Sequence, residues 1–550
     1  MADIVLINPR FEVSYWGLEH ALPLFGKRAN LPVACLPLLA ALTPAEHRVT
    51  LLDENVEPID FDRVARADIV GVTGMSVQRF RMREILTELK RRGAFTVVGG
   101  PWVTVQEDYF GPLADVVFVG EAEETWPRFL AEWKLGRHQA RYEQAAKTDM
   151  TRVPTPRFDL LPMRHYLFGS VQFSRGCPFQ CEFCDIIVTF GRRPRLKTAA
   201  QVITELEALR AQKMRIVFIV DDNLIGNKKA VKPLLRELIA WQQAHGYPMV
   251  FFTEASLDLA EDPELMQLMV DANIVSVFVG IESPNEASLR ETRKFQNLRP
   301  PHPHPSPPAG GEGKELPSSP PAGGEGRVRG GNSILDRVHA IQRAGLEVWC
   351  GMILGFDHDD PTIFDAQREF IREARIVHAM VGMLHAIPKT PLHARLAAEG
   401  RLDPADVPAF GTNVIPKQIS REELRAGYLR VLNDLYHPDA YFDRLEDLFL
   451  RHRMAYAPGR ARWWRRHPWN RLKTQAANLA RALVLFARLM GKVPDPALRR
   501  EYRKRVGRLL AVRRDPAVLL LYLVKCAMHY HSYTMARQMA RGDCPIVNSF

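Results

Sequence analysis

The sequence is short of cysteine for its length, with seven in 550 residues. That is too sparse for a disulfide-stapled scaffold, so the disulfide-rich secreted class is excluded. No apolar run reaches the roughly 18–20 residues that a membrane-spanning helix needs, and the longest ends at Lys525. The opening segment MADIVLINPR has neither the basic stretch nor the cleavage site of a signal peptide, so we expect a cytoplasmic protein.

Positive and negative residues are unevenly distributed along the chain. Hydrophobic residues make up 46% and charged residues 25%, as in soluble globular proteins. The net charge is +11, yet residues 451–514 alone hold 19 Lys and Arg against two acids, an excess of 17. The rest of the chain is therefore net negative, and the basic character belongs to the C-terminal segment.

Five short β-branched runs alternate with amphipathic stretches near the start of the chain. These runs are Ile4–Pro9, Val49–Glu54, Ile69–Gly74, Phe95–Gly100 and Val116–Glu121. Continuous apolar strands that alternate with helices predict an α/β domain with a parallel sheet, so we expect residues 1–145 to form a doubly wound, flavodoxin-like (Rossmann-type) domain. Ligands of such sheets lie at the carboxyl ends of the strands, where Gly99 and Gly100 allow either close approach or only a tight turn.

A proline-rich linker at 146–169 precedes a second series of strand and helix signals, at 170–390. Its strand candidates are Ser170–Gly176, Arg215–Asn223, Met249–Ser256, Val275–Ser283, Glu347–Phe356 and Val381–Pro388. Six βα units predict a partial (β/α)6 barrel with its functional residues at the strand ends. The stretch 299–331, which contains SPPAGGEG twice, has almost no large apolar residue, so we expect a disordered insertion without a catalytic role.

Residues 391–550 have helical periodicity. One predicted face holds Leu479, Leu483, Phe486 and Met490, and another holds Leu498, Tyr502, Val506 and Leu509. The opposite faces are rich in arginine, and three tryptophans lie within Arg460–Arg471. Two interpretations stay open: a helical cap with a solvated basic face, or peripheral contact with anionic lipid on the inner face of the membrane. No nucleic-acid-binding motif is present, so we expect no nucleic-acid partner.

Three cysteines stand close together in the segment SRGCPFQCEFCDI. Cys177, Cys181 and Cys184 form C-x3-C-x2-C directly after the first barrel-strand candidate. A structural zinc ion needs four protein ligands, and the nearest candidate for a fourth, His165, lies beyond a whole strand. Thiolates also hold iron–sulfur clusters.

This cysteine motif, with Phe183 just before its last cysteine and a strand before it, resembles that of the radical S-adenosylmethionine (SAM) superfamily. The doubly wound domain ahead of the barrel is similar to that of the cobalamin-binding subgroup. More closely, roughly residues 1–440 without the insertion resemble the hopanoid C-2 methylase family. The segments that carry this resemblance are EHALPLFGKRANLP, CEFCDI, VDDNLIGNKKA, GIESP, GMILGFDHDD and AIPKTPL.

The resemblance implies three cofactors: a [4Fe–4S] cluster held by the three cysteines, SAM on the free iron of that cluster, and cobalamin on the first domain. It also implies an external electron donor, because an electron must enter SAM to yield the 5′-deoxyadenosyl radical. The residues implied around SAM are Phe183, Asp221, Asp222, Asn223, Glu254, Glu282, Gly351, Ile353 and Gly355. Those implied around the cobalamin are Thr73, Ser76, Gly99 and Gly100.

The sequence departs from the family pattern in two places. Asp221-Asp222-Asn223 stand where many relatives carry Gly-Gly-Glu for the amino group of SAM, although carboxylates still suit an ammonium. The D-x-H-x-x-G motif of many cobalamin domains, whose histidine ligates cobalt, is missing after the first strand, which favours cobalamin bound in a His-off mode, with no histidine on the cobalt. His20 lies a long loop away and is expected to be structural.

The resemblance implies a methyltransferase that acts on an unactivated carbon of a small molecule or of a hopanoid-like lipid. One alternative keeps both cofactors but performs a radical cyclisation or rearrangement. A second alternative, an RNA methylthiotransferase, is disfavoured because those enzymes hold another cluster on three N-terminal cysteines. Here only Cys35 precedes Cys177. A zinc-stabilised binding protein is the non-enzymatic alternative.

Overall fold

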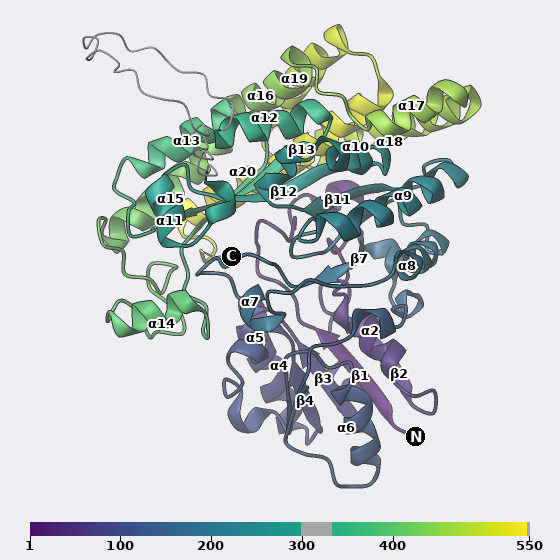
Figure 1. Ribbon diagram of the computed structural model, residues 1–550, viewed down its shortest axis with the longest axis vertical. Coiled ribbons are helices and arrows are strands. Elements are labelled where there is room, and N and C mark those ends of the chain that lie inside the picture. Colours follow the sequence, from purple (N-terminus) through teal and green to yellow (C-terminus); the bar gives the residue numbers. More distant parts are fainter. Residues whose placement is uncertain (299–332, 547–550) are drawn as a thin grey trace, which may run out of the picture.

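The computed structural model describes residues 1–298 and 333–546, so the expected insertion at 299–331 lies outside the described residues. The chain forms two parallel sheets, one after the other, and then a series of helices (Figure 1). In Figure 1 the first sheet lies at the bottom, the second lies above it, and most C-terminal helices lie toward the top. The predicted α/β architecture is confirmed.

The first sheet has six strands in the order β2-β1-β3-β4-β5-β6, all parallel. The strands are β1 (Asp3–Asn8), β2 (Arg48–Asp53), β3 (Ile69–Thr73), β4 (Thr96–Gly99), β5 (Val116–Val119) and β6 (Arg141–Glu143). The sequence predicted only five strands. It missed β6 because this short edge strand has one apolar residue, Tyr142, which stacks on Phe118 with ring centroids 5.2 Å apart.

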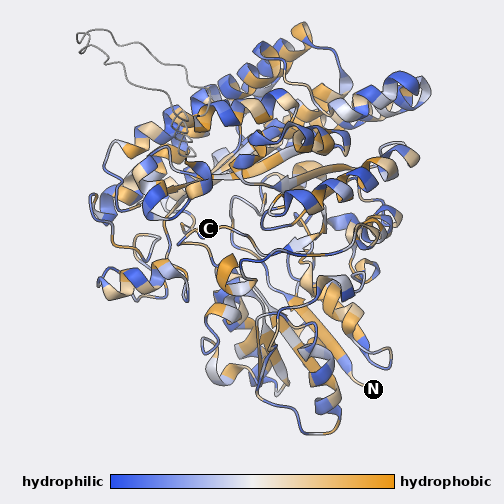
Figure 2. Cartoon of the chain, viewed as in Figure 1, coloured by the Kyte–Doolittle hydropathy of each residue, from blue (hydrophilic) through white to orange (hydrophobic). Residues whose placement is uncertain are grey.

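Helices cover both faces of the first sheet. One face packs against α2 (Cys35–Leu42) and α6 (Thr125–Lys134), and the other against α3 (Phe61–Val64), α4 (Arg79–Arg91) and α5 (Pro101–Val105). The strands are strongly apolar because both of their faces are buried in this way (Figure 2).

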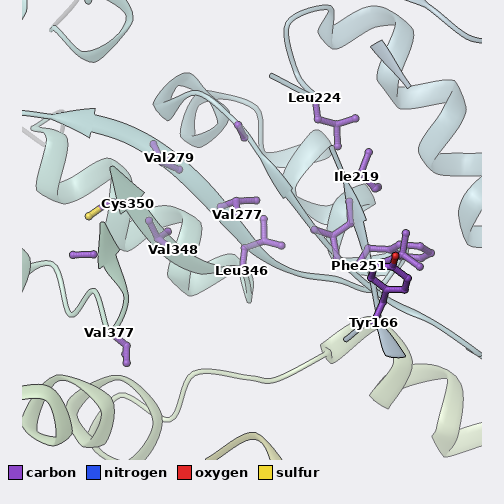
Figure 3. Packing of buried hydrophobic residues seen from close by; sticks show 14 of the residues in the cluster. Tyr166, Ile219, Leu224, Phe251, Val277, Val279, Leu346, Val348, Cys350 and Val377 are labelled. Carbon is purple, nitrogen blue, oxygen red and sulfur yellow. The ribbon is translucent and has the colours of Figure 1, made fainter. Parts of the chain in front are cut away.

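The second sheet is an open barrel with the strand order β14-β13-β12-β11-β10-β7, again all parallel. The strands are β7 (Gly169–Val171), β10 (Ile216–Ile219), β11 (Val250–Glu254), β12 (Ile274–Glu282), β13 (Glu347–Leu354) and β14 (Ala379–Met383). Val277, Val348 and their neighbours form a continuous buried layer (Figure 3). The predicted partial barrel is confirmed.

The first barrel strand is shorter than predicted. The sequence predicted one strand over Ser170–Gly176, but β7 ends at Val171, and the next pair, β8 (Ser174–Arg175), lies antiparallel to β9 (Arg195–Leu196). The Asp221 carboxylate accepts hydrogen bonds from the backbone N–H groups of Phe173 and Ser174, at 2.7 and 2.8 Å. These two N–H groups therefore do not pair with the neighbouring strand β10, and the chain turns toward the cysteines.

Helices cover the outside of the barrel. They are α8 (Ala199–Ala211), α9 (Lys228–Ala244), α10 (Pro263–Asp271), α11 (Glu286–Glu291), α12 (Ile334–Ala344) and α13 (Ile363–Glu373). Capping boxes begin α8 at Thr198, with Gln201, and α12 at Ser333, with Asp336. These boxes satisfy backbone donors that a helix start otherwise leaves unpaired.

The C-terminal region is helical, as predicted. Its helices are α14 (Pro391–Ala398), α15 (Arg421–Leu435), α16 (Pro438–Glu446), α17 (Pro458–Arg466), α18 (Pro468–Lys492), α19 (Pro496–Val512) and α20 (Pro516–Arg541). The predicted buried face of α19 is confirmed. The predicted face of α18 is only partly covered: Phe486 and Met490 are half-buried and pack on the core, whereas Leu479 and Leu483 are exposed. The fully buried residues of α18 are Asn478, Ala482, Leu485 and Leu489.

The longest helix, α20, joins the base of the barrel to the N-terminal loop. Lys525 forms a buried ion pair with Glu347 at the start of β13, with Nζ 2.5 Å from Oε1. His531 Nε2 lies 2.9 Å from the Ser14 carbonyl oxygen. His20 Nε2 lies 3.0 Å from Gln538 Oε1, so His20 contacts α20, as expected of a structural histidine.

In the two described ranges, none of the helices combines the length and the apolar character that crossing a bilayer requires.

Candidate cofactor site

The loops at the carboxyl ends of the two sheets meet. Arg175, at the end of β8, lies 2.7 Å from Glu121 and 2.6 Å from Glu123, both of which follow β5. Lys389, after β14, donates to the Thr104 carbonyl oxygen at 2.8 Å. Because ligands of parallel sheets bind at these strand ends, the two sheets offer one shared region between them.

The three cysteines occupy the loop between β8 and α7 (Ile186–Thr189). Gly176 opens this loop with φ of +96°, and a Cβ there would lie only 2.8 Å from the Gly191 carbonyl oxygen. Only glycine fits at that position. Cys181 is buried, while Cys177 and Cys184 are half-buried. The turn at Gly176 therefore directs the cysteine loop toward the strand ends of the barrel.

The thiols influence one another electrostatically. Burial raises the pKa of the Cys177 and Cys184 thiols, and the charge of Cys181 raises both further. Gln296 Nε2 lies 3.4 Å from Cys181 Sγ. In the described part of the chain, no three His, Cys, Asp or Glu side chains are arranged to hold one metal ion. Three neighbouring thiols are, however, a donor set that suits a cluster whose iron atoms each take one thiolate.

The cysteine loop is held from the C-terminal region through Glu182. Arg395 in α14 lies 2.9 Å from the Glu182 carboxylate and 2.8 Å from that of Asp357, which follows β13. The Glu182 backbone N–H donates to the Thr292 carbonyl oxygen at 2.9 Å. These contacts fix the segment between two of the cysteines against three other parts of the fold.

Lys294 lies beside the cysteine loop, and sequence reasoning missed it. Its Nζ is 2.6 Å from Glu282 Oε1 and 5.9 Å from the centre of the Phe183 ring. Burial lowers the pKa of Lys294, but the charges of Glu282 and Cys181 raise it more, so the pKa lies above its ordinary value. No motif or periodicity marks this lysine, because its importance comes only from the fold.

The Asp221-Asp222-Asn223 segment follows β10 directly. Asp221 binds the backbone after β7, as described above, and Asp222 accepts from the Gly176 N–H at 2.9 Å. The Asn223 side chain bonds to the backbone and the hydroxyl of Ser256 after β11. The segment therefore positions the cysteine loop and the next strand end, and its role toward SAM stays a prediction.

The acids at this edge are short of positive charge. Burial raises the pKa of Asp221 to about 7 and that of Asp222 to about 6. Burial, followed by the charges of Asp222 and Asp221, raises the pKa of Glu254 to about 8. A cation bound among these carboxyls would lower their pKa values again. These carboxylate acceptors therefore fit the ammonium group of SAM, which donates hydrogen bonds.

Phe183 and the predicted residues of β13 come together. Phe183 packs against a small apolar cluster that contains Ile353 and Phe356, and the two phenylalanine ring centroids are 6.3 Å apart. Gly351 pairs with Gly280 across β13 and β12, and the side chains of Glu282 and Lys294 lie over Gly280. Gly355 has φ of +102° and ends the strand in a turn. Phe183 and Ile353 therefore offer an apolar surface of the kind that suits an adenine ring.

The predicted cobalamin residues lie at the carboxyl edge of the first sheet. Thr73 pairs with Gly99 across β3 and β4. Gly100 has φ of +98°, and a Cβ there would lie 2.3 Å from Thr73 Oγ1. Ser76 begins a short 3-10 helix, η1 (Ser76–Gln78), three residues after β3, and Met75 beside it is exposed. The structure therefore gathers these residues at one edge.

Two buried polar groups near this edge have no partner within the described residues, the Nδ1 atom of His385 and the Nε1 atom of Trp102. His385 follows β14, and burial together with the charge of Arg79 lowers its pKa to about 4. The Arg79 guanidinium lies 5.2 Å from the centre of the Trp102 ring. Unpaired buried donors and acceptors are costly, so they fit an edge that receives a polar ligand such as cobalamin.

Comparisons with known proteins decide the family. A model described as B12 binding domain matches residues 31–130, one described as Radical SAM superfamily matches 171–366, and a domain of unknown function matches 390–543. The hopanoid C-2 methylase of Rhodopseudomonas palustris is 32% identical over 99% of this chain and 95% of its own length. The chain belongs to the cobalamin-binding radical SAM superfamily.

Other members of this superfamily share its sequence or fold. An uncharacterized methyltransferase of Synechocystis is 39% identical over 81% of this chain and 78% of its own length. The cobalamin-dependent SAM radical enzyme OxsB has the same fold, with a TM-score of 0.56, 12% identity and coverage of 99% of this chain and 82% of its own. TsrM of Kitasatospora setae, a radical SAM methyltransferase, gives a TM-score of 0.54 at 18% identity over 72% of this chain and 76% of its own.

This radical SAM enzyme therefore has the cofactors of its superfamily, a [4Fe–4S] cluster, SAM and cobalamin, and the two relatives matched over 81% and 99% of this chain are methyltransferases. The expected cofactors and the expected enzyme class are confirmed. The roles of single residues toward each cofactor stay predictions.

Proposed function

We propose that this enzyme transfers a methyl group to an unactivated carbon of a polycyclic, hopanoid-like lipid. The observation that carries the proposal is the similarity to hopanoid C-2 methylase along 99% of the chain, which includes the C-terminal region of unknown function. A similarity confined to the two cofactor domains would support the chemistry but not the substrate.

Cys177, Cys181 and Cys184 would hold the cluster. Bound there, the cluster supplies an electron to SAM, and cobalamin supplies the methyl group. The protein's part is to fix the cysteine loop through Gly176 and Glu182 and to place the positive charge of Lys294 next to the sulfurs. An external electron donor belongs to this proposal.

Asp222 and Glu254 would receive the amino group of SAM, because burial raises the pKa of both carboxyls and a bound ammonium would offset that effect. Phe183 and Ile353 would bound the adenine. Glu282 is already paired with Lys294, so its contribution would be to orient that lysine.

Thr73, Ser76, Gly99 and Gly100 would line the cobalamin. His385 would add a neutral imidazole from the opposite, barrel side, where its Nδ1 has no partner among the described residues. This histidine takes no part in the D-x-H-x-x-G motif that the sequence lacks, and sequence reasoning did not single it out.

An aromatic cavity inside the barrel supports an apolar substrate. Its walls are Tyr15, Trp16, Leu18, Asn30, Leu31, Phe168, Phe218, Phe252, Trp349, His378, Met528 and Ser532. Phe218 and Phe252 stack with ring centroids 4.7 Å apart. The cavity measures about 40 Å³, which is room for roughly three water molecules. A polycyclic skeleton is larger, so the N-terminal loop and α20, which form one wall of the cavity, must move outward to admit it.

The test is anaerobic reconstitution with iron, sulfide, cobalamin, SAM and a reductant, followed by product analysis against a hopanoid and against a water-soluble extract. We expect 5′-deoxyadenosine and a hopanoid heavier by one methyl group. A methylated product that arises only from the soluble extract would overturn the lipid assignment. A product of unchanged carbon count would favour the cyclisation or rearrangement alternative.

The location of the enzyme in the cell and the bounds of its domains are also part of this proposal. We propose a cytoplasmic enzyme that contacts the membrane peripherally through its basic C-terminal helices. The division of the chain at 1–145, 146–169, 170–390 and 391–550 remains a prediction, with which the bounds of β6, β7 and α14 agree.

A further inference from the structure

Exposed apolar side chains gather on α18. The described residues include 13 large apolar side chains that are exposed, and five of these lie on this one helix. They are Trp469 at 80% exposure, Leu472 at 62%, Leu479 at 41%, Leu483 at 59% and Val484 at 51%. Single exposed apolar residues are ordinary on protein surfaces, but a group on one element indicates a binding surface.

These side chains form a continuous stripe. Positions 469, 472, 479 and 483 are spaced by three, four or seven residues, which places them on one face of a helix. Ala476, Ala480 and Ala487 are also exposed and extend the same face. From Trp469 to Val484 the stripe is roughly 22 Å long. We name these residues the α18 apolar stripe. The opposite face of α18 is buried and packs on α20.

Basic residues are exposed on α18 and on α17 before it. By the helical spacing of about 100° per residue, Lys473 lies on the face of the stripe, whereas Arg471 and Lys492 point toward the opposite face. Arg471, Lys473, Arg481 and Lys492 on α18 are all exposed, as are Arg465 and Arg466 on α17. Neither helix contains a single aspartate or glutamate, and the first acid after them is Asp495. Basic side chains beside tryptophan and leucine suit the surface of an anionic bilayer. A second copy of this chain would set like charges against one another.

The position of α18 connects the stripe to the aromatic cavity. The helix packs on α20 and contacts α1 (Leu22–Phe25), where Arg488 Nη1 donates to the Leu24 carbonyl oxygen at 3.2 Å. Met528 of α20 and Leu18, just ahead of α1, both line the cavity. The two segments that close the cavity therefore lie directly beneath the helix that carries the stripe.

We propose that the α18 apolar stripe docks this enzyme on an anionic lipid bilayer. Leucine and tryptophan side chains enter the interface, while Lys473 on the same face and the exposed Arg465 and Arg466 of α17 contact anionic headgroups. Docked in this way, the enzyme holds the wall of its aromatic cavity next to the phase in which an apolar substrate dissolves. This inference deepens the membrane contact of the proposed function by naming its surface and partner, and its link to substrate rests on that function.

The test is sedimentation of the full-length protein with sucrose-loaded vesicles of phosphatidylcholine alone or mixed with phosphatidylglycerol. The wild type is expected to bind the mixed vesicles. The double variant Leu479→Ser/Leu483→Ser is expected to bind them at least about tenfold more weakly, since two exposed leucines lose their insertion energy. Val407→Ser is the control, because Val407 is 68% exposed but lies away from α18. It should bind like the wild type.

Three results would overturn the proposal. In the first, the wild type does not bind the mixed vesicles, and in the second, the double variant binds them as tightly as the wild type does. The third result is a dimer of the wild type in light scattering where the double variant is a monomer. The last result would show that a second copy covers the stripe. Formation of 5′-deoxyadenosine from SAM is measured without vesicles and should persist in the double variant, so failure of docking and failure of the proposed chemistry are separate outcomes.

Discussion

At the scale of single residues, Lys294 is the cation that most directly faces the cysteine loop. It pairs with Glu282 and acts on Cys181. A positive charge close to a cluster favours its reduced form, because reduction adds a negative charge. Lys294→Met should therefore move the midpoint potential of the reconstituted cluster to more negative values, by on the order of 50 mV.

A redox titration followed by electron paramagnetic resonance measures this potential. The matched control is Lys228→Met, which removes a lysine that pairs with Asp258 after β11. If Lys294→Met leaves the potential where the control leaves it, the lysine does not act on the cluster.

His385 is a second residue at the site, and its Nδ1 atom has no hydrogen-bond partner among the described residues. Its pKa of about 4 keeps the imidazole neutral at physiological pH, and only a neutral imidazole offers a nitrogen to a metal. We expect nitrogen splitting in the paramagnetic resonance spectrum of bound cob(II)alamin, and we expect His385→Ala to abolish it. His20→Ala, a histidine held by α20, should change nothing. A wild-type spectrum without nitrogen splitting would remove His385 from the cobalt.

The sequence could predict the cysteines but neither Lys294 nor His385. The three cysteines lie within one short segment, so their spacing can be read directly from the sequence. Lys294 reaches Glu282 and the cysteine loop only after β12 and the following helix have folded, and His385 meets Arg79 across two sheets. Contacts of this kind depend on tertiary structure, which no local pattern records.

At the scale of elements, α20 is held in place by one buried ion pair. Lys525 and Glu347 are both almost fully buried. Removing one partner of such a pair leaves an uncompensated buried charge, at a cost of about 3–5 kcal/mol. Lys525→Met should lower the free energy of unfolding by that amount, as measured by denaturant titration.

The double variant Lys525→Met/Glu347→Gln should regain most of the loss, since it leaves no unpaired charge behind. Equal stability of the single variant and the wild type would show that the pair does not hold α20.

The buried face of a helix can be predicted where the helix has a single apolar face, but not where it has two. α19 has one buried face, and its predicted residues are buried. α18 carries apolar residues on two neighbouring faces, and both fit helical spacing. Only packing against α20 decides that Leu485 and Leu489 are buried while Leu479 and Leu483 face outward. The short edge strand β6 was missed for the opposite reason, because it has almost no apolar pattern.

At the scale of the whole molecule, Arg175 links the two sheets. It pairs with Glu121 and Glu123 of the first sheet and stands two residues before Cys177. Arg175→Met should leave the Glu123 carboxylate without its ion-pair partner and Glu121 with Arg195 alone, and so loosen the contact between the two sheets. We expect faster proteolysis at 146–169, measured by limited trypsin digestion. Arg91→Met, which removes an exposed arginine outside this segment that pairs with Glu88 on the same helix, serves as the control. Equal digestion rates in both variants would contradict this role.

The claim on which the account depends is that three sulfurs of one loop hold the cluster that activates SAM. The direct measurement is 5′-deoxyadenosine formed from SAM by anaerobically reconstituted protein, compared between wild type and Cys177→Ser, Cys181→Ser and Cys184→Ser. The account predicts product from the wild type and from the control Cys544→Ser, and none from the other three variants, which also lose the iron–sulfur absorption. Undiminished product in any of those three would contradict it.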